Sequence, residues 1–174
     1  MKSFQFAAGF AAAALLGACQ SVPSDAPKAT AVLEPTKGST VRGTASFVQI
    51  GDKVRLSASV SGLKPNGEFG FHIHEAGDCS SGDGMSTKGH FNPYGKAHGG
   101  YSMPEHHAGD MPSLKSDAGG NGSVSVDLVG VSVVAGPGSV VGRGLIVHAQ
   151  QDDFKTQPTG NAGARSACAV IQRS

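Results

Sequence analysis

The stretch Phe71-His72-Ile73-His74 places two histidines and two apolar residues in strict alternation. Successive side chains of a β-strand point to opposite faces, so both imidazoles lie on one face and Phe71 and Ile73 on the other. The alternation therefore predicts a strand that presents two neighbouring nitrogen ligands on a rigid support. A β architecture and a metal-binding surface follow from the same four residues.

The composition around this stretch agrees with a single, loop-rich β domain. The chain has 174 residues, with 26 Gly, 9 Pro, no Trp and 16% charged side chains. This much Gly and Pro argues against long helices, and the length suffices for one domain. The net charge is +1 and like charges form no block, so the electrostatic footprint of a nucleic-acid-binding protein is absent. We therefore expect an all-β fold without a nucleic-acid partner.

Short runs of Val, Ile, Thr and Phe between Gly, Pro, Asn and Ser predict antiparallel strands along the rest of the chain. The expected strands lie near residues 29–34, 41–50, 53–61, 69–74, 96–101, 123–128, 141–149 and 167–172. Three segments, 75–96, 102–121 and 150–165, have almost no strand pattern. Long segments of this kind in a compact domain are usually functional or disordered.

The N-terminus has the pattern of an export signal. A basic start at Lys2 precedes an apolar run over residues 4–16, which is too short to span a bilayer as a stable helix. The run ends in Leu16-Gly17-Ala18-Cys19, which resembles the lipobox of bacterial lipoproteins, where the cysteine is lipidated and begins the mature chain. Ordinary cleavage nearby is the alternative.

This interpretation divides the chain into three parts. We expect a signal peptide over residues 1–18, a lipidated Cys19 with a flexible tether over residues 19–28, and a folded domain over residues 29–174. The expected location is the bacterial periplasm, with the lipid at Cys19 as the membrane anchor. Removal of the signal peptide takes away one lysine and leaves a mature chain without net charge.

The three cysteines are at positions 19, 79 and 168. Assigning Cys19 to a lipid leaves Cys79 and Cys168, which an exported protein would oxidise. A bridge between them would close a loop of roughly 90 residues and be worth about 4 to 5 kcal/mol in the loop-entropy model. Two free buried thiols are the alternative.

All seven histidines fall between positions 72 and 148. Besides the pair on the opening stretch, the candidate ligands are His90, His98, His107 and Asp110 in Gly-rich segments and His148 at the end of an apolar run. A set of imidazoles with one carboxylate suits zinc, and imidazoles on rigid β positions also suit copper. A single histidine is more often a surface or hydrogen-bonded core residue, but the clustering favours a metal centre. His106 adjoins His107 and has the poorer spacing to Asp110, so we expect it to lie outside the centre.

These motifs resemble the copper/zinc superoxide dismutases of the bacterial, exported kind. The resemblance covers about residues 29–174. It rests on Gly70-Phe71-His72-Ile73-His74-Glu75, Gly89-His90-Phe91-Asn92-Pro93, His98-Gly99-Gly100, His107-Ala108-Gly109-Asp110, Gly142-Arg143, Val147-His148, Gly160-Asn161-Ala162-Gly163-Ala164-Arg165 and Cys168. It implies an eight-stranded Greek-key β-sandwich or flattened barrel whose metals lie on two long loops outside it.

The resemblance also implies one copper and one zinc ion per subunit. The implied copper ligands are His72, His74, His90 and His148, and the implied zinc ligands are His90, His98, His107 and Asp110. His90 would then bridge both metals as an imidazolate. Asp152 matches a carboxylate that links a copper-ligand ring to a zinc-ligand ring, whereas we expect Asp153 to be a solvated acidic turn residue.

The implied activity is dismutation of superoxide to oxygen and hydrogen peroxide by a copper ion that alternates between two oxidation states. In the family's mechanism His90 leaves reduced copper, takes up a proton and delivers it as peroxide forms, while zinc orders the loop. Arg165 matches the arginine that guides the anion to copper, and Thr159 matches a residue that narrows the channel. Because the mature chain is neutral, steering must be local, and Lys155 is a further candidate for it.

The sequence leaves two questions open, one about function and one about oligomeric state. A protein that buffers or delivers copper or zinc without turnover would need the same ligands, but it would have no use for Arg165. The resemblance also suggests a homodimer. Bacterial dimers of the family often bury a Trp, and because this chain has none a monomer stays open.

Overall fold

The computed structural model describes residues 25–174. The expected signal peptide and Cys19 lie outside these residues. Within the described part the strands are β1 (Lys28–Pro35), β2 (Arg42–Ile50), β3 (Lys53–Ser61), β4 (Glu68–Phe69), β5 (Phe71–His74), β6 (Leu114–Lys115), β7 (Gly122–Leu128), β8 (Gly144–His148), β9 (Arg165–Val170) and β10 (Gln172–Arg173). The 3₁₀ turn η1 covers Met85–Thr87. No helix in this part is long and apolar enough to cross a membrane.

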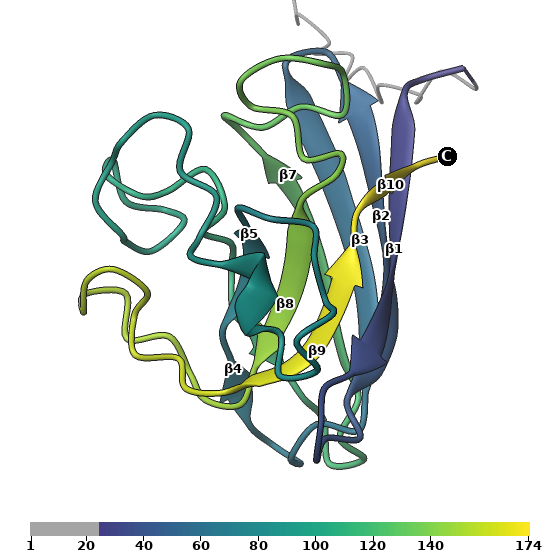
Figure 1. The fold of residues 1–174 in the computed structure, drawn as a ribbon, viewed down its shortest axis with the longest axis vertical. Coiled ribbons are helices and arrows are strands. Elements are labelled where there is room, and N and C mark those ends of the chain that lie inside the picture. Colours follow the sequence, from purple (N-terminus) through teal and green to yellow (C-terminus); the bar gives the residue numbers. More distant parts are fainter. Residues whose placement is uncertain (1–24) are drawn as a thin grey trace, which may run out of the picture.

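The strands form one curled antiparallel sheet that folds back on itself (Figure 1). Its order is β5-β8-β9-β1-β2-β3-β7, and β10 adds to β1, which makes eight strands. β1 joins the two sides, because its residues 28–33 pair with β2 and Glu34 pairs with Cys168 of β9. The separate pair β4 and β6 closes one end. This architecture confirms the expected all-β, eight-stranded sandwich.

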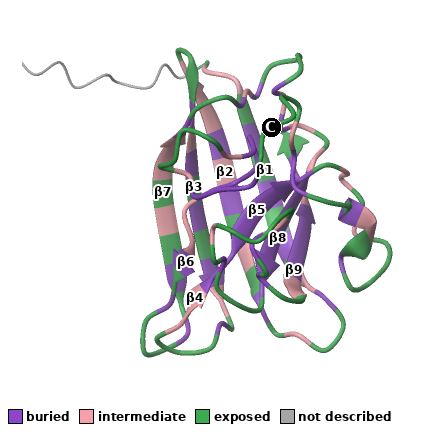
Figure 2. Cartoon of the chain, turned by 90° about the vertical axis from the view of Figure 1, so that its left-hand side faces the viewer, coloured by how far each residue is buried: buried purple, intermediate pink, exposed green. Residues whose placement is uncertain are grey.

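Apolar alternation explains the long strands. In β3, Val54, Leu56, Ala58 and Val60 are buried and the residues between them are more exposed. β5 and β8 differ, because every residue of both strands is buried (Figure 2). The outer side of these two strands is covered by loops, so polar side chains on that side are also removed from water.

Most expected strands are confirmed to within a few residues, but the strand expected over 96–101 is wrong. Side chains occupy the backbone groups that a strand would pair with a neighbour: the N–H of Lys96 donates to Asn92, that of His98 to Gln157 and that of Gly99 to Asp110. The region is therefore a loop. Conversely, β6 lies in segment 102–121, where no strand was expected.

Two long segments leave the sheet on the same side (Figure 1). The zinc-side loop, as we call residues 75–113, connects β5 to β6, and the entrance loop, residues 149–164, connects β8 to β9. A disulfide between Cys79 and Cys168 ties the zinc-side loop to β9, which confirms the expected bridge. These two loops cover β5 and β8 and carry the candidate ligands that do not lie on strands.

Candidate metal centre

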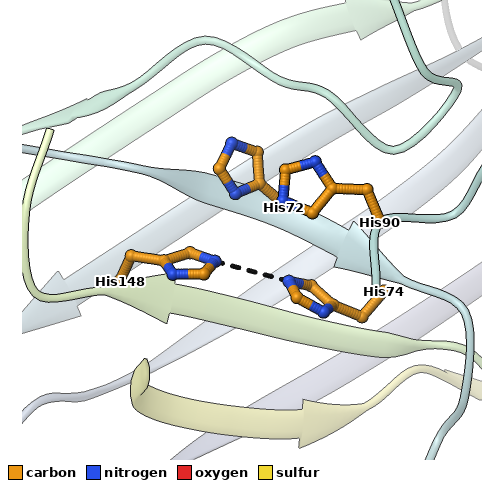
Figure 3. A group of neighbouring side chains, drawn as sticks. All are labelled: His72, His74, His90 and His148. Carbon is orange, nitrogen blue, oxygen red and sulfur yellow. Dashed lines mark hydrogen bonds between the residues drawn. The ribbon is translucent and has the colours of Figure 1, made fainter. Parts of the chain in front are cut away.

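The first cluster of ligands rests on strands. His72 and His74 lie on β5 opposite Ile146 and Gly144 of β8, and His148 ends β8. Their rings converge with that of His90 from the zinc-side loop (Figure 3). One ligand atom from each of these four residues lies within 4.8 Å of the others, and all four residues are buried. We call His72, His74, His90 and His148 the strand cluster.

Backbone carbonyls fix two of these rings. Nδ1–H of His74 donates to the carbonyl of Lys88 at 2.9 Å, and Nδ1–H of His148 donates to that of Gly163 at 3.2 Å. Their Nε2 atoms then carry lone pairs and face each other at 3.3 Å (Figure 3). Two facing lone pairs repel each other unless a cation or a proton lies between them. Facing Nε2 lone pairs are therefore the arrangement expected of two ligands that share a metal ion.

Three members of the strand cluster, His74, His90 and His148, are uncharged at neutral pH. Burial is the largest effect on the pKa values of His74 and His148, and together with neighbouring imidazoles and Arg165 it lowers both well below the ordinary 6.5. Burial and repulsion by His72 also lower the pKa of His90 to about 4, against the pull of Asp110. Neutral imidazoles are the form that binds metals.

The second cluster lies entirely in the zinc-side loop. His90, His98, His107 and Asp110 are all buried, and a ligand atom from each lies within 4.8 Å of the others. The Oδ1 atom of Asp110 lies 2.7 Å from Nδ1 of His90, 3.0 Å from Nδ1 of His98 and 3.4 Å from Nδ1 of His107. Its Oδ2 atom accepts the backbone N–H groups of Gly99 and His107. We call these four residues the loop cluster.

A carboxylate charge distinguishes the loop cluster. Burial alone would raise the pKa of Asp110, but its interactions with the imidazoles of His107, His90 and His98 outweigh burial and lower the pKa below its usual range. Burial alone would lower the pKa of His98, but Asp110 and Asp152 outweigh it and raise the pKa to about 9. The loop cluster therefore combines one firmly ionised carboxylate with three imidazoles.

Asp152 connects the two clusters, as the resemblance implied. Its Oδ2 atom lies 2.8 Å from Nε2 of His72, and its Oδ1 atom lies 3.0 Å from Nε2 of His98. The N–H of Phe154 also donates to Oδ1. Because Nε2 of His72 donates to Asp152, its Nδ1 atom is the nitrogen left for the strand cluster.

Both clusters fit metal ions. Among the described residues, three buried ring nitrogens have no hydrogen-bond partner: Nδ1 of His72, Nε2 of His90 and Nδ1 of His107. All three belong to the clusters. Burying polar atoms without partners costs free energy, and a bound metal ion would supply the missing partner of these nitrogens. Four imidazoles suit copper, and three imidazoles with one carboxylate suit zinc.

Comparison with known proteins decides the family. The family model described as copper/zinc superoxide dismutase (SODC) matches residues 41–171. The chain belongs to the copper/zinc superoxide dismutase family. Superoxide dismutase [Cu-Zn] 2 of Aquifex aeolicus (strain VF5) is 42% identical over 149 residues, which cover 83% of this chain and 86% of that protein. Superoxide dismutase [Cu-Zn] of Paramecium bursaria Chlorella virus 1 is 42% identical over 137 residues, which cover 75% of this chain and 72% of that protein.

A solved structure agrees with the fold. The crystal structure of the clock protein EA4 superposes with a TM-score of 0.76 at 38% identity and covers 84% of this chain and 94% of that one. Copper/zinc superoxide dismutases use copper and zinc, and the two clusters described above are able to hold one ion each.

Arg165 lies beside the strand cluster of this superoxide dismutase. Its Nη1 atom donates to the carbonyl of Gly84 at 2.5 Å and to the hydroxyl of Thr87 at 2.9 Å, and Nη2 donates to the carbonyl of Lys88 at 2.5 Å. Half-buried, the guanidinium contributes to the lowered pKa values of both His74 and His148. The two carbonyl groups that flank η1 and the hydroxyl of Thr87 therefore fix a positive charge next to the candidate copper ligands.

The remaining expected residues lie as follows. Thr159 is half-buried in the entrance loop, and Lys155 is exposed there. The carboxylate of Asp153 is exposed and accepts the N–H groups of Lys155 and Thr156, which is an acidic turn. Nδ1–H of His106 donates to the carbonyl of His107, and His106 is in neither cluster.

The site depends on three further residues whose roles were not predicted from the sequence, namely Lys88, Gly160 and Gln157. Lys88 has a φ of 62°, and its carbonyl serves both His74 and Arg165. A Cβ atom on Gly160 would lie 1.8 Å from Oδ1 of Asp152, so only glycine fits there. Nothing in the local pattern marks Lys88 or Gln157, whereas Gly160 belongs to the quoted Gly-rich motif.

Proposed function

We propose that the chain dismutes superoxide to oxygen and hydrogen peroxide, with copper held by the strand cluster and zinc by the loop cluster. The observation that carries this proposal is the position of His90 in both clusters. Its Nδ1 atom faces Asp110, and its Nε2 atom is the nitrogen left for the strand cluster. A buffer with independent metal sites would need no shared imidazole.

When bound, copper supplies one-electron redox chemistry and zinc supplies a fixed positive charge without redox chemistry. The protein contributes neutral, rigid ligands. Burial keeps His74 and His148 unprotonated, and their bonds to the carbonyls of Lys88 and Gly163 hold their Nε2 atoms in place. Asp152 holds the ring of His72 in the same way.

Conversion of two superoxide ions to oxygen and hydrogen peroxide consumes two protons. We assign His90 the role of carrying one of them: its Nε2 atom takes up a proton and gives it to the substrate as peroxide forms. Geometry supports this role, because Nε2 of His90 has no hydrogen-bond partner within residues 25–174 while Nδ1 of the same ring faces Asp110.

Arg165 is the residue that we assign to substrate attraction. Superoxide is a small anion, and a guanidinium that stays charged at all physiological pH values holds such an anion by charge and hydrogen bonds. Its three bonds to Gly84, Thr87 and Lys88 keep it oriented without neutralising it. Thr159 and Lys155 of the entrance loop are secondary candidates, for channel width and local charge.

Dismutation by the purified protein reconstituted with copper and zinc tests the proposal. We expect fast, copper-dependent turnover that falls more than about a hundredfold in His148→Ala and several-fold in Arg165→Ala. His106→Ala is the matched control and should keep full activity, because His106 is in neither cluster. Stoichiometric metal binding without turnover would support a copper or zinc buffer instead.

We also propose export to the bacterial periplasm. The signal-peptide pattern over residues 1–18, the lipobox-like Cys19 and the tether over 19–28 support this location, as does a disulfide in the domain over 29–174. Mass spectrometry of the protein from bacterial membranes, with Cys19→Ser as control, should find a lipid on Cys19. A homodimer stays a prediction that light scattering of the same protein tests.

A further inference from the structure

The side chain of Gln157 binds both backbone groups of His98. The N–H of His98 donates to Oε1 of Gln157 at 2.9 Å, and Nε2 of Gln157 donates to the carbonyl of His98 at 2.9 Å. Two residues in a hydrogen-bonded antiparallel pair exchange the same two bonds. The amide of Gln157 thus replaces the neighbouring strand that residues 96–101 lack.

Gln157 sits on a braced support. Oδ1 of Asp153 accepts the N–H groups of Lys155 at 2.9 Å and Thr156 at 2.8 Å. The N–H of Gly160 donates to the carbonyl of Thr156 at 2.7 Å, and that of Asp153 donates to the carbonyl of Gly160 at 2.9 Å. Residues 153–160 therefore form a closed turn. This turn fixes the backbone from which the side chain of Gln157 extends toward His98.

The same turn also reaches the ring of His98. Asp152, directly before the turn, accepts from Nε2 of His98 at 3.0 Å. The entrance loop thus holds His98 at three points, namely the ring, the backbone N–H and the backbone carbonyl. Asp152 orients the ring about the side-chain bonds, whereas Gln157 fixes the backbone from which the ring extends.

We propose that Gln157 is a positioning residue for the zinc site. Gln157 fixes the backbone of His98 against the entrance loop, which carries Thr159 and leads to Arg165. Zinc affinity therefore depends on how well ordered the entrance loop is. This inference rests on the assignment of His98 as a zinc ligand. Coupling is reciprocal, so zinc binding in turn orders the entrance loop through Gln157.

Two substitutions separate the effects of the two hydrogen bonds to His98, and a third is the control. Gln157→Met keeps the length of the side chain and removes both bonds to His98, together with a longer bond from Nε2 of Gln157 to the carbonyl of Lys155 at 3.3 Å. Gln157→Glu keeps an oxygen that accepts from the N–H of His98 but loses the donor to its carbonyl. Gln151→Met is the matched control, because Gln151 is an exposed residue of the same loop and no hydrogen bond of its side chain is found within residues 25–174.

The experiment is zinc titration of the metal-free full chain against a chromophoric chelator, with copper absent. We expect the zinc Kd to rise about tenfold in Gln157→Met and by a smaller factor in Gln157→Glu, because a hydrogen bond contributes about 1 kcal/mol. Gln151→Met should bind zinc like the unaltered protein. An unchanged zinc Kd in Gln157→Met would overturn the inference.

Thermal unfolding distinguishes positioning from a purely structural role. Zinc binding adds a requirement for His98 at one place, so zinc should raise the Tm less in Gln157→Met than in the unaltered protein. Equal decreases in Tm with and without zinc would overturn the inference. In the zinc-loaded protein, amide exchange at His98 should be faster in Gln157→Met than in Gln157→Glu, which keeps the acceptor.

The outcome is independent of turnover. If the unaltered protein binds zinc and His98→Ala abolishes binding, the zinc assignment holds even when dismutase activity is absent. The effect of Gln157→Met on zinc Kd then decides the inference by itself. If His98→Ala leaves zinc affinity unchanged, the assignment on which the inference rests is wrong, and the inference fails with it.

Discussion

The strand cluster and the loop cluster hold their ligands by different means. Three members of the strand cluster lie on β5 and β8, whose sheet pairing positions them without help from a carboxylate in the cluster. All members of the loop cluster lie in the zinc-side loop, where Asp110 binds the imidazoles of His90 and His98 and two backbone N–H groups, and lies 3.4 Å from the imidazole of His107. A sheet positions imidazoles by its own geometry, whereas a loop requires a buried charge and bracing from a second loop.

Removal of the charge should disable only the loop cluster. We expect Asp110→Asn to weaken zinc binding more than about a hundredfold, because roughly 10–16 kcal/mol of structural zinc binding is shared among four ligands. Three strand-cluster ligands, His72, His74 and His148, have no hydrogen bond to Asp110 within residues 25–174, so copper binding should change much less. Parallel titrations with each metal measure the difference. Glu105→Gln, an exposed change in the same loop, is the control, and equal losses for both metals would contradict the comparison.

Removal of the link that Asp152 makes between the two clusters should have a smaller effect on zinc affinity. Asp152→Asn keeps an oxygen for one ring but replaces the other with an amide, so it cannot accept from both His72 and His98. We expect zinc affinity to fall about tenfold, as for other residues that orient metal ligands. Chelator competition measures this change, with the exposed Glu105→Gln again as the control. Unaltered zinc affinity in Asp152→Asn would mean that the loop cluster is held without this link.

The two clusters also differ in how far the sequence predicts them. Alternation in Phe71-His72-Ile73-His74 places two ligands from strand geometry alone, and the apolar run before His148 places a third. The loop cluster followed from the clustering of histidines and one carboxylate in Gly-rich segments, and the motif resemblance then assigned its members to zinc, because no periodicity relates ligands in a loop. Long-range contacts explain the main error. Gln157 binds the backbone of His98 and Asp110 binds that of Gly99, and the local sequence pattern carries no signal for such contacts.

In the metal-free protein the two clusters should lose stability on opposite sides of neutral pH. The pKa values of His74 and His148 lie well below 6.5, so as the pH falls below about 6.5 only the unfolded chain takes up protons there, and stability decreases. The pKa of His98 is raised to about 9. Its stabilising contribution is therefore complete below about pH 6.5 and is lost as the pH rises through about 9. Urea unfolding across this range measures both effects.

Single variants assign each side of this profile. His98→Gln should remove the loss between about pH 7 and 9 and leave the loss in acid, because Gln does not titrate. His148→Gln should reduce the loss in acid and leave the alkaline side. His106→Gln belongs to neither cluster and should change neither side. A metal-free protein whose stability is constant from about pH 7 to 9 would show that Asp110 and Asp152 do not stabilise protonated His98.

The smallest expected effect concerns Lys88, whose backbone carbonyl accepts hydrogen bonds from both His74 and Arg165. Lys88 has φ 62° and ψ −146°, a region that only glycine adopts freely, and this orientation aims its carbonyl at His74 and Arg165. Such strain costs about 1–3 kcal/mol, and glycine gives back about 0.5–1 kcal/mol through its freer unfolded chain. Because the ion pair with Glu75 is exposed, its loss matters little.

We therefore expect Lys88→Gly to raise stability by about 1 kcal/mol and the Tm by about 2–4 °C. The carbonyl keeps both of its donors, so activity at physiological ionic strength should stay within about twofold. Lys88→Ala is the control, because it removes the same ammonium group and keeps the strain. If the Gly and Ala variants unfold at the same temperature, the backbone at residue 88 is unstrained. The orientation of the carbonyl between His74 and Arg165 then carries no cost in stability.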